Sequence, residues 1–365
     1  MVSEMMSLDP NAEFVFYAPR PVDIALPSGQ WRLRTESGAL GRFVNLWAQV
    51  QLPRWTAEDR LDAFWGQNNV LPLRLSRRFF RLLTVHDLVP FVCPRTLRLE
   101  SALTRKYYLL KACRAADAVI ADSEATARDI VRLLGVSRDR VRTVYFGVHG
   151  RFQPIPKDAA RKVTARKYGL PRDYLLTVGT IEPRKDHVVL LRALRMIPNA
   201  PMLVIAGGVG WKSAAIVREI SAMEKAGRVR HLGWVDDADL PHLYSAAALL
   251  VFPSSYEGFG LPLLEAMACG CPTLSTWSSS LPEVGGGAAR YFRTGDSADL
   301  ALKLKGLLAD ERQRATMAAD GLMRAKRFTF RKAAQEILDI LRTGVAEFHR
   351  DLQGSVARHA TVLPR

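Results

Sequence analysis

The sequence predicts an α/β protein of two domains, each built on a doubly wound parallel sheet. Its 365 residues are enough for two domains of ~100–200 residues each. Short apolar runs alternate with longer segments of helical periodicity, which is the order typical of parallel strands joined by helices. The alternation stops once, in the Gly- and Pro-rich stretch 147–158, and then starts again. We therefore expect a first domain over residues 1–152, a second over 153–345 and a tail over 346–365.

The first domain shows six short apolar or aromatic runs that predict strands. They occupy residues 14–18, 31–34, 61–66, 79–85, 117–122 and 140–146. Helical patterns lie near 96–115 and 123–134. Ser123 stands where a helix N-cap is expected, and Glu124 follows it in the first turn, which favours a helix start at this point.

The second domain repeats the alternation with five predicted strands, at 174–178, 202–207, 229–234, 248–253 and 271–276. Helices are expected near 186–197, 212–226, 238–247, 261–269 and 297–309, with two more amphipathic helices near 311–326 and 330–350. After about Gln353 we expect loosely ordered chain. Two sheets joined by a linker create a cleft between their carboxyl ends, where ligands of such sheets bind.

The composition favours a soluble protein of a reducing compartment. Hydrophobic residues make up 48% and charged residues 24% of the chain, as in ordinary globular domains. We find no apolar stretch of the ~18–20 residues that span a bilayer and no signal-peptide pattern, so we expect a cytoplasmic protein. Four cysteines fit this compartment, and the C-x-C spacing of Cys269 and Cys271 predicts buried packing residues rather than a metal site.

The net charge of +16 could serve nucleic acid, an anionic membrane face or anionic small molecules. Lys and Arg are spread along the chain without a compact basic arm or a nucleic-acid-binding motif, so we expect no nucleic acid partner. We favour attraction to a phosphorylated donor and acceptor, with peripheral contact to the anionic inner membrane face as an option. The alternative is a compositional Arg bias without function.

The strongest chemical signal is the segment VFPSSYEGFGLPLLEAMACG, residues 251–270. A buried strand ends there and a polar loop leads into a helix, for which Pro262 suits the first position and Gly270 the C-cap. Glu257 lies in the loop and Glu265 one turn inside the helix, so both should face the cleft. The alternative is that these glutamates cap the helix and the glycines only form turns.

The loop itself predicts an anion site beside two carboxylates. Gly258 and Gly260 let the backbone come close to a ligand, and free N–H groups at the helix start bind anions. Carboxylates accept hydrogen bonds from hydroxyl groups. The loop and helix can therefore hold a phosphate-linked sugar.

These residues resemble the Glu-x7-Glu signature of the family 4 retaining glycosyltransferases, which have the GT-B fold. Other stretches resemble further parts of this family in order and spacing: residues 178–194 its first donor-domain unit, 278–292 the segment after the Glu motif, and 84–94 and 116–136 its acceptor domain. The resemblance covers roughly residues 60–310 and is nearest to a mannosyltransferase-like branch. It implies an enzyme that moves a sugar, mannose being favoured, from a nucleoside-diphosphate sugar to a glycan or lipid-linked acceptor.

The resemblance also implies roles for individual residues. Glu257 would contact the donor sugar, Glu265 the ribose hydroxyls, and the pair Arg184 and Lys185 the diphosphate, whose growing negative charge a fixed cation pair stabilises. His86 would lie near the donor sugar. The remaining expected donor-binding positions are Gly179, Thr180, Gly258, Phe259, Gly260 and Leu261. GDP-mannose is the favoured donor and a UDP-sugar the alternative.

Several of these positions have alternatives. Arg184 and Lys185 could form a solvated basic loop, and His86 could be a satisfied histidine at a strand end. Asp87 is expected to orient backbone. Asp186 stands where the family more often has Asn. Glu283 either orients the Glu257 loop or caps residues 284–287.

We expect no metal ion, because no Asp-x-Asp occurs in a suitable loop. Asp236 and Asp237 precede a predicted helix and are interpreted as N-caps.

The first domain departs from the family pattern, which opens with a strand, a Gly-rich loop and a helix. The run FVFYA at 14–18 resembles the family's second strand, so we expect the opening strand and loop to be missing. The alternative is that SGALGR, residues 37–42, serves as the loop. A missing strand would expose the middle of a parallel sheet and weaken stability or activity.

Two other classes of protein share parts of this pattern. A dinucleotide-dependent oxidoreductase needs G-x-G-x-x-G after a strand, and AGGVGWK at 206–212 has the wrong spacing. A non-catalytic binding protein for sugar nucleotides or glycans remains the alternative to the enzyme.

Overall fold

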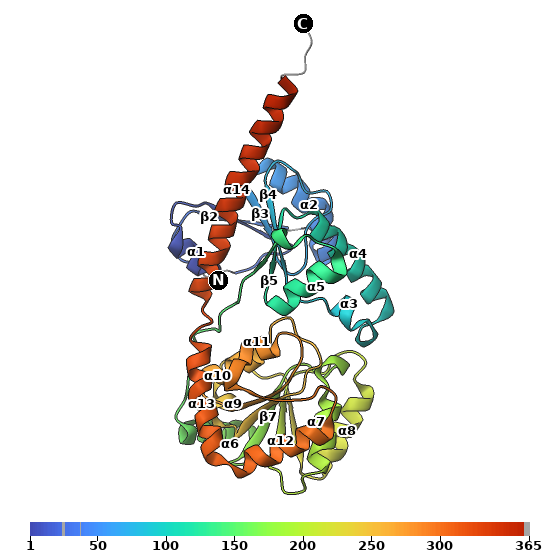
Figure 1. Ribbon diagram of the computed structural model, residues 1–365, viewed down its shortest axis with the longest axis vertical. Coiled ribbons are helices and arrows are strands. Elements are labelled where there is room, and N and C mark those ends of the chain that lie inside the picture. Colours follow the sequence, from blue (N-terminus) through green and yellow to red (C-terminus); the bar gives the residue numbers. More distant parts are fainter. Residues whose placement is uncertain (24–25, 37, 361–365) are drawn as a thin grey trace.

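The structure is a computed structural model that describes residues 1–23, 26–36 and 38–360. Figure 1 shows two α/β domains one above the other, with the last helix running back along the first domain.

The second domain has a single sheet of six parallel strands. They are β7 (Tyr174–Val178), β8 (Met202–Ala206), β9 (Val229–Gly233), β10 (Leu249–Phe252), β11 (Thr273–Thr276) and β12 (Arg290–Phe292). Their order is β12-β11-β10-β7-β8-β9, so the winding direction reverses between β7 and β10. Ligands of doubly wound sheets bind at the carboxyl ends of the strands beside such a reversal.

Both faces of this sheet are buried, because alternate residues of each strand point to opposite sides. Leu176 and Leu250 pack into one core, and Leu175 and Leu249 into the other. The helices that cover the sheet and follow it are α6 (Lys157–Tyr168), α7 (His187–Arg195), α8 (Ala214–Lys225), α9 (Leu240–Ala246), α10 (Leu261–Ala268), α11 (Leu281–Gly285), α12 (Ser297–Ala309) and α13 (Glu311–Ala325).

The first domain carries its strands in two separate sheets. A four-stranded parallel sheet has the order β3 (Ala63–Gly66), β4 (Phe80–Val85), β5 (Ala118–Ala121) and β6 (Val141–Thr143), while β1 (Phe14–Ala18) and β2 (Trp31–Thr35) pair only with each other. Among the described residues no strand joins β1 to β3. Their contact is made by rings, with the centroids of Tyr17 and Phe64 6.3 Å apart. The break lies where the sequence predicted a missing strand.

The first domain's helices are α1 (Val2–Leu8), α2 (Val44–Glu58), α3 (Val89–Val92), α4 (Leu99–Ala115) and α5 (Glu124–Leu134). The sequence analysis did not predict α1 or α2. Pro53 lies inside α2, and an internal proline normally argues against a helix.

The candidate loop SGALGR lies partly outside the described residues, since Ser37 is not among them. Ala39–Arg42 form a short 3₁₀ turn between β2 and α2. A Cβ on Gly41 would lie 1.9 Å from the carbonyl oxygen of Pro19. Glycine is therefore required for this turn to pass the end of β1.

The last helix, α14 (Phe330–Ala360), packs on the first domain. Ala334 and Ile337 join Leu82 and Ile120 in one core. A Cβ on Gly344 would lie 2.2 Å from the Phe80 ring, so this glycine lets the helix approach β4. The second domain was expected to extend to residue 345, but α14, which begins at Phe330, packs on the first domain. The chain after Gln353 was expected to be loosely ordered, but it is helical to Ala360.

Two chain segments cross side by side between the domains. The backbone N–H of Val148 donates to the carbonyl of Phe328 over 3.3 Å. A Cβ on Gly147 would lie 2.1 Å from the backbone nitrogen of Phe330. The predicted linker at 147–158 is therefore one of two chain segments that connect the domains, and the segment around Phe328 is the other.

Two further findings concern the whole described chain. Cys269 and Cys271 are free and buried, which confirms the predicted packing role. Within the described ranges, no helix is both long and apolar enough to cross a bilayer.

Candidate active site

The candidate site lies where the second sheet reverses its winding direction. The loop after β7 carries residues 179–185, and the loop after β10 carries residues 253–260. The two loops are joined directly, because the backbone N–H and the hydroxyl of Ser255 both donate to the carbonyl of Arg184 over 2.9 Å. The two segments that the sequence singled out separately thus form one site.

Glu257 is the centre of a buried cluster of charges. Its carboxylate accepts from Lys185 Nζ over 2.6 Å and lies 2.9 Å from a guanidinium nitrogen of Arg184. Arg184 also pairs with Glu182 over 2.7 Å. The side chains of Arg184 and Lys185 are largely buried, so they do not form a solvated basic loop.

The two cations determine the ionisation of Glu257. Burial would raise the pKa of its carboxyl group, but the charges of Lys185 and Arg184 outweigh burial and lower the pKa below its ordinary value. Burial likewise opposes the charge of Arg184, and Glu257 and Glu182 outweigh it and raise the pKa of the guanidinium. Glu257 and Arg184 are therefore both charged near neutral pH.

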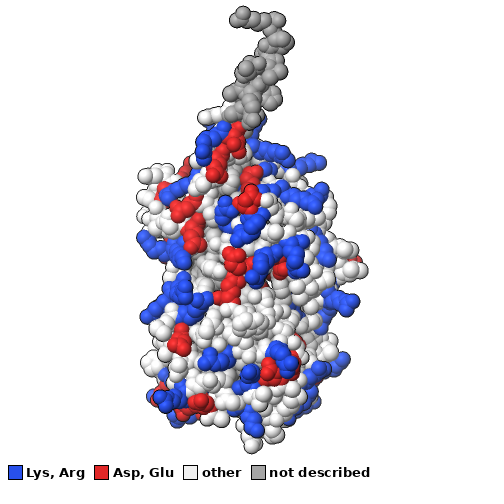
Figure 2. Space-filling model, viewed as in Figure 1, with Lys and Arg blue, Asp and Glu red and all other residues white. Residues whose placement is uncertain are grey.

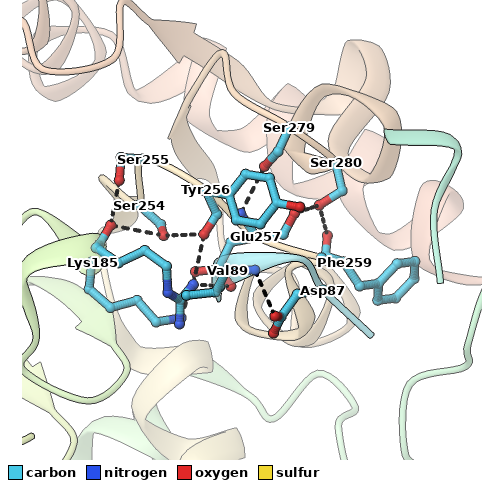
Figure 3. A network of polar contacts seen from close by, with 12 residues as sticks. Asp87, Val89, Lys185, Ser254, Ser255, Tyr256, Glu257, Phe259, Ser279 and Ser280 are labelled. Carbon is cyan, nitrogen blue, oxygen red and sulfur yellow. Dashed lines mark hydrogen bonds and ion pairs between the residues drawn. The ribbon is translucent and has the colours of Figure 1, made fainter. Parts of the chain in front are cut away.

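The backbone around Glu257 is held from the following segment of the chain. Ser279 accepts from the N–H of Glu257 over 2.8 Å, and the Ser280 hydroxyl donates to the carbonyls of Glu257 and Phe259 over 3.0 and 2.8 Å. Figure 3 shows these serines on one side of the loop and Lys185 on the other. The sequence analysis did not single them out, although the run SSS at 278–280 could have signalled a hydrogen-bonding segment.

Gly258 is one of the points where the two domains touch. A Cβ there would lie 1.7 Å from the carbonyl oxygen of His86, so only glycine fits. Its own carbonyl accepts from the hydroxyls of Ser123 and Thr126 over 2.6 and 3.1 Å. The N-terminus of α5 in the first domain therefore holds the Glu257 loop of the second.

Gly260 turns the loop into helix α10. Its φ of 102° lies in the region that favours glycine. Phe259 points into the core, with ring centroids 6.4 Å from Tyr145 and 5.9 Å from Phe328, whereas Leu261 is exposed. Phe259 was expected to contact the donor, but its side chain packs in the core instead.

Glu265 lies inside α10 and is not part of the cluster around Glu257. Its carboxylate accepts from the hydroxyl of Tyr244 over 2.8 Å. Burial raises the pKa of Glu265, and the Tyr244 hydrogen bond opposes this in part. This carboxylate has capacity for further hydroxyl groups.

Gly179 and Thr180 lie at the end of β7. Gly179 has a φ of 144°, in the region that favours glycine, and the Lys185 side chain lies beside it. Thr180 is exposed. Asp186 has a φ of 47°, a conformation in which Asn and Asp are the commonest residues other than glycine. This explains how Asp replaces the family's more frequent Asn.

His86 lies in the first domain, at the end of β4 and opposite Gly258. Its Nδ1 lies 2.7 Å from an oxygen of Asp122, which follows β5, and its backbone N–H donates to the Asn69 side chain over 2.9 Å. Burial would lower the pKa of His86, but the hydrogen bond and charge of Asp122 outweigh burial and raise it. Asp122 and Asn69 were not among the predicted site residues, although Asp122 ends the predicted strand 117–122 and Asn69 lies three residues after the predicted strand 61–66.

A cavity of about 360 Å³ opens in the first domain next to this histidine. Its lining combines side-chain amides, a carboxylate, a cation and an aromatic ring; the residues are Gln49, Asn68, Asn69, Asp87, Arg105 and Tyr108, with apolar Val70, Leu71, Pro90 and Leu109. Asp87 accepts from the N–H of Val89 over 3.0 Å, the backbone role expected from the sequence.

Glu283 joins the domains in a way that the sequence did not predict. Its carboxylate accepts from the N–H groups of Glu124 and Ala125, at 2.6 and 3.2 Å, and from the hydroxyl of Tyr145 at 2.6 Å. It therefore caps helix α5 of the other domain, in addition to the local cap Ser123.

Tyr256 makes a second link between the domains. Its hydroxyl donates to Asp129 over 3.0 Å and accepts from the N–H of Leu88 over 3.3 Å. Both partners belong to the first domain, so the loop that carries Glu257 is fixed to it at two neighbouring residues.

In the part of the chain that the structure describes, no group of three or more His, Cys, Asp or Glu side chains could hold a metal ion. Asp236 and Asp237, which the sequence interpreted as caps, pair with Lys167 and Arg151. Asp239 stands at the N-cap of α9, without a side-chain cap hydrogen bond.

Both domains of the chain are similar to known protein families. Residues 161–322 match the family described as "Glycosyl transferases group 1", and residues 19–150 match "Glycosyltransferase Family 4". The O-antigen chain mannosyltransferase B of Escherichia coli is 32% identical over 292 residues, which cover 78% of this chain and 75% of that protein. The chain belongs to the family 4 glycosyltransferases. It is therefore a hexosyltransferase-type enzyme, and the sequence-based family assignment is confirmed.

Two further proteins are similar to this glycosyltransferase. The serotype-specific mannosyltransferase WbdA of Escherichia coli is 33% identical over 261 residues, which cover 68% of this chain but only 32% of that longer protein. The crystal structure of Anabaena Alr3699/HepE in complex with UDP and glucose has a TM-score of 0.73 at 20% identity and covers 93% of this chain and 94% of that one. This likeness confirms the predicted GT-B fold.

Proposed function

We propose that this glycosyltransferase transfers mannose, with retention, from a nucleoside-diphosphate donor to a glycan or lipid-linked acceptor. The observation that carries the proposal is the buried Glu257–Lys185–Arg184 cluster at the switch point of the second sheet. Similarity to two mannosyltransferases supports the sugar. GDP-mannose is the favoured donor; the UDP of a structural neighbour makes a UDP-sugar the alternative.

In the proposed complex, Lys185 and Arg184 bind the diphosphate and stabilise the charge that it gains as the sugar departs. Because the protein holds these cations in place before the donor binds, they need not reorganise during the reaction, and this lowers the energy of the transition state. Glu257 holds them in place and turns its carboxylate toward the sugar hydroxyls. Glu265, with Tyr244 on one side of its carboxylate, is proposed to accept from the ribose.

Across the cleft, His86 is proposed to contact the donor sugar. Asp122 fixes the ring orientation and favours the imidazolium, which can donate to a sugar hydroxyl or to the developing charge. In a retaining front-face reaction, the leaving phosphate helps to deprotonate the acceptor hydroxyl.

The cavity beside His86 is proposed to bind the acceptor. Side-chain amides, a carboxylate and a tyrosine ring are the groups that recognise sugar hydroxyls and sugar faces. Residues of this cavity come from the first domain alone, so the acceptor and donor would meet across the cleft. We also propose a cytoplasmic location, supported by four free cysteines, with peripheral contact to the anionic inner membrane face.

The test is a donor screen that measures binding and transfer side by side. Thermal shifts are recorded with GDP-mannose, UDP-glucose and GDP alone, since a ligand at about 100 times its Kd adds roughly 2.7 kcal/mol to stability. Release of GDP is then followed with mannose-terminated oligosaccharides. We expect GDP-mannose to stabilise the protein and to be turned over. Stabilisation by UDP-glucose alone would overturn GDP-mannose as the donor. Binding of the donor without transfer to any acceptor would favour a non-catalytic binding protein.

A further inference from the structure

The outer face of helix α2 is apolar although it faces solvent. Phe43 at the N-cap, Leu46 and Val50 are each more than half exposed. Their spacing of i, i+3 and i+7 places them on one side of the helix. Ala48 and Leu52 on the other side of the helix are buried in the core. Surface helices normally present charged or polar residues outward, so this face requires a separate explanation.

The apolar face continues onto the neighbouring loop at the mouth of the cavity. Gln49, on α2, accepts from the N–H of Leu73 over 2.8 Å, which holds the loop 72–78 beside the helix. Val70 and Leu73 are more than a third exposed, and Gln49 and Val70 both line the cavity. The proposed acceptor cavity therefore opens beside this apolar surface.

Positive charge surrounds the same surface. Arg42, Arg74, Arg77 and Arg78 are exposed, and within the described ranges no carboxylate forms an ion pair with any of them. Residues 41–115 contain thirteen Lys and Arg against five Asp and Glu. Their net charge of +8 is half of the chain's +16, in about a fifth of its length. Lys and Arg are also more widespread than Asp and Glu over the face of the molecule drawn in Figure 2.

We propose that the outer face of α2 and the loop 72–78 form the surface by which this enzyme docks on anionic lipid. Apolar side chains flanked by arginines are what an anionic interface binds, because the side chains enter the headgroup boundary while the guanidinium groups pair with lipid phosphates. The docked surface places the cavity mouth at the lipid headgroups, within reach of a lipid-linked acceptor. The docking surface deepens the membrane contact proposed above, and the placement of the cavity mouth rests on the proposed acceptor.

A second exposed apolar stripe on α4 fits the cavity less well. It consists of Leu99, Leu103 and Tyr107. At 100° per residue, Leu103 lies about 160° around the helix from Arg105, which lines the cavity. Docking through this stripe would turn the cavity away from the lipid, so it serves as the rival surface in the test.

The test is co-sedimentation of the full chain with vesicles of phosphatidylcholine alone or mixed with phosphatidylglycerol. We expect binding to the anionic vesicles that is at least about tenfold stronger than to the neutral ones, and that falls with salt. The double variant Leu46→Glu with Val50→Glu should lose about tenfold or more of this binding. Leu302→Glu, at a similarly exposed leucine of α12 in the other domain, is the matched control and should bind like the unaltered protein.

Thermal melting and the donor-induced thermal shift establish that each variant is folded. The variant Leu103→Glu tests the rival stripe on α4. Equal vesicle binding by the double variant and the control would overturn the proposal, and so would a loss of vesicle binding in Leu103→Glu alone. No binding to either vesicle would also overturn it and would leave a protein partner as the occupant of this face. Because sedimentation needs neither donor nor acceptor, its outcome does not depend on whether mannosyl transfer is confirmed.

Discussion

The two domains differ in how completely each forms its part of the site. In the second domain a continuous six-stranded sheet carries two loops that neutralise each other's charges at Glu257, Lys185 and Arg184. In the first domain the strands form two sheets, and the corresponding edge is an open cavity beside His86. The side chains of the charge cluster are held by one another, whereas the cavity of the first domain has space for a ligand.

On the proposed function, this difference predicts which part of the enzyme sets the rate and which sets the specificity. The charge cluster would stabilise the departing diphosphate, a step that all such transferases share. The open cavity would bind the acceptor, which varies between them. Substitutions in the donor half should therefore change kcat, and those in the cavity should change KM.

The charge cluster should give the largest effect. Lys185→Ala removes a cation from the leaving group and leaves Glu257 with less compensation, and we expect kcat to fall by about 10²–10³-fold or more. Glu257→Gln should give a comparable loss. The control is Lys225→Ala on α8, an exposed lysine far along the chain. If steady-state kinetics showed unchanged kcat in both cluster variants, the donor half would not be the catalytic half.

The contact between the domains should come next. Gly258→Ala places a methyl group against the backbone carbonyl of His86 and close to Cβ of Asp87. We expect transfer to fall by about 10–100-fold because a displacement of about 1 Å is enough to misalign the groups. Gly287→Ala, where a Cβ would meet nothing within 4 Å, is the control. A normal transfer rate in Gly258→Ala would show that the two halves need not touch here.

Glu283 should have a moderate effect, seen in the acceptor half although the residue belongs to the donor half. Glu283→Ala removes the acceptors for two N–H groups of α5, and loss of a cap costs about 1 kcal/mol. Hydrogen exchange should become faster at the amides of Glu124 and Ala125. Faster exchange confined to the second domain would contradict the cross-domain cap.

The smallest expected effect is a pH dependence of the His86–Asp122 pair. The pKa of His86 is raised in the folded protein, so the pair stabilises fully below the ordinary histidine pKa of 6.5 and loses this as pH rises through the higher folded value. Partial exposure of His86 limits the pair to about 1 kcal/mol or less. Urea denaturation should show that Asp122→Asn costs more near pH 6 than near pH 9. An equal cost at both would mean that His86 stays neutral.

Sequence reasoning was most successful in the donor half. Four of its five predicted strands are apolar runs that end at or just before Gly or Pro. All five predicted strands exist, and the short edge strand β12 was missed. The family resemblance singled out Glu257, Lys185 and Arg184, and the structure brings them together. In the acceptor half, α2 was missed because Pro53 interrupts its pattern.

The remaining errors have one cause, which is that the partners are distant in sequence. Glu283 was expected to act near its own position, but its partners lie 159 and 158 residues away. The return of α14 to the first domain depends on Phe80 and Leu82 meeting residues after 330. No local pattern of residues contains such information.

The return of α14 makes the donor domain an insertion within the acceptor domain. The first domain needs both ends of the chain, since Leu82 and Ile120 would be left uncovered without Ala334 and Ile337. A fragment that stops after the linker should therefore aggregate. The continuous stretch between the two crossings at Val148 and Phe328 can instead be exchanged as a cassette, so that donor preference could be transplanted between relatives while the acceptor cavity stays intact.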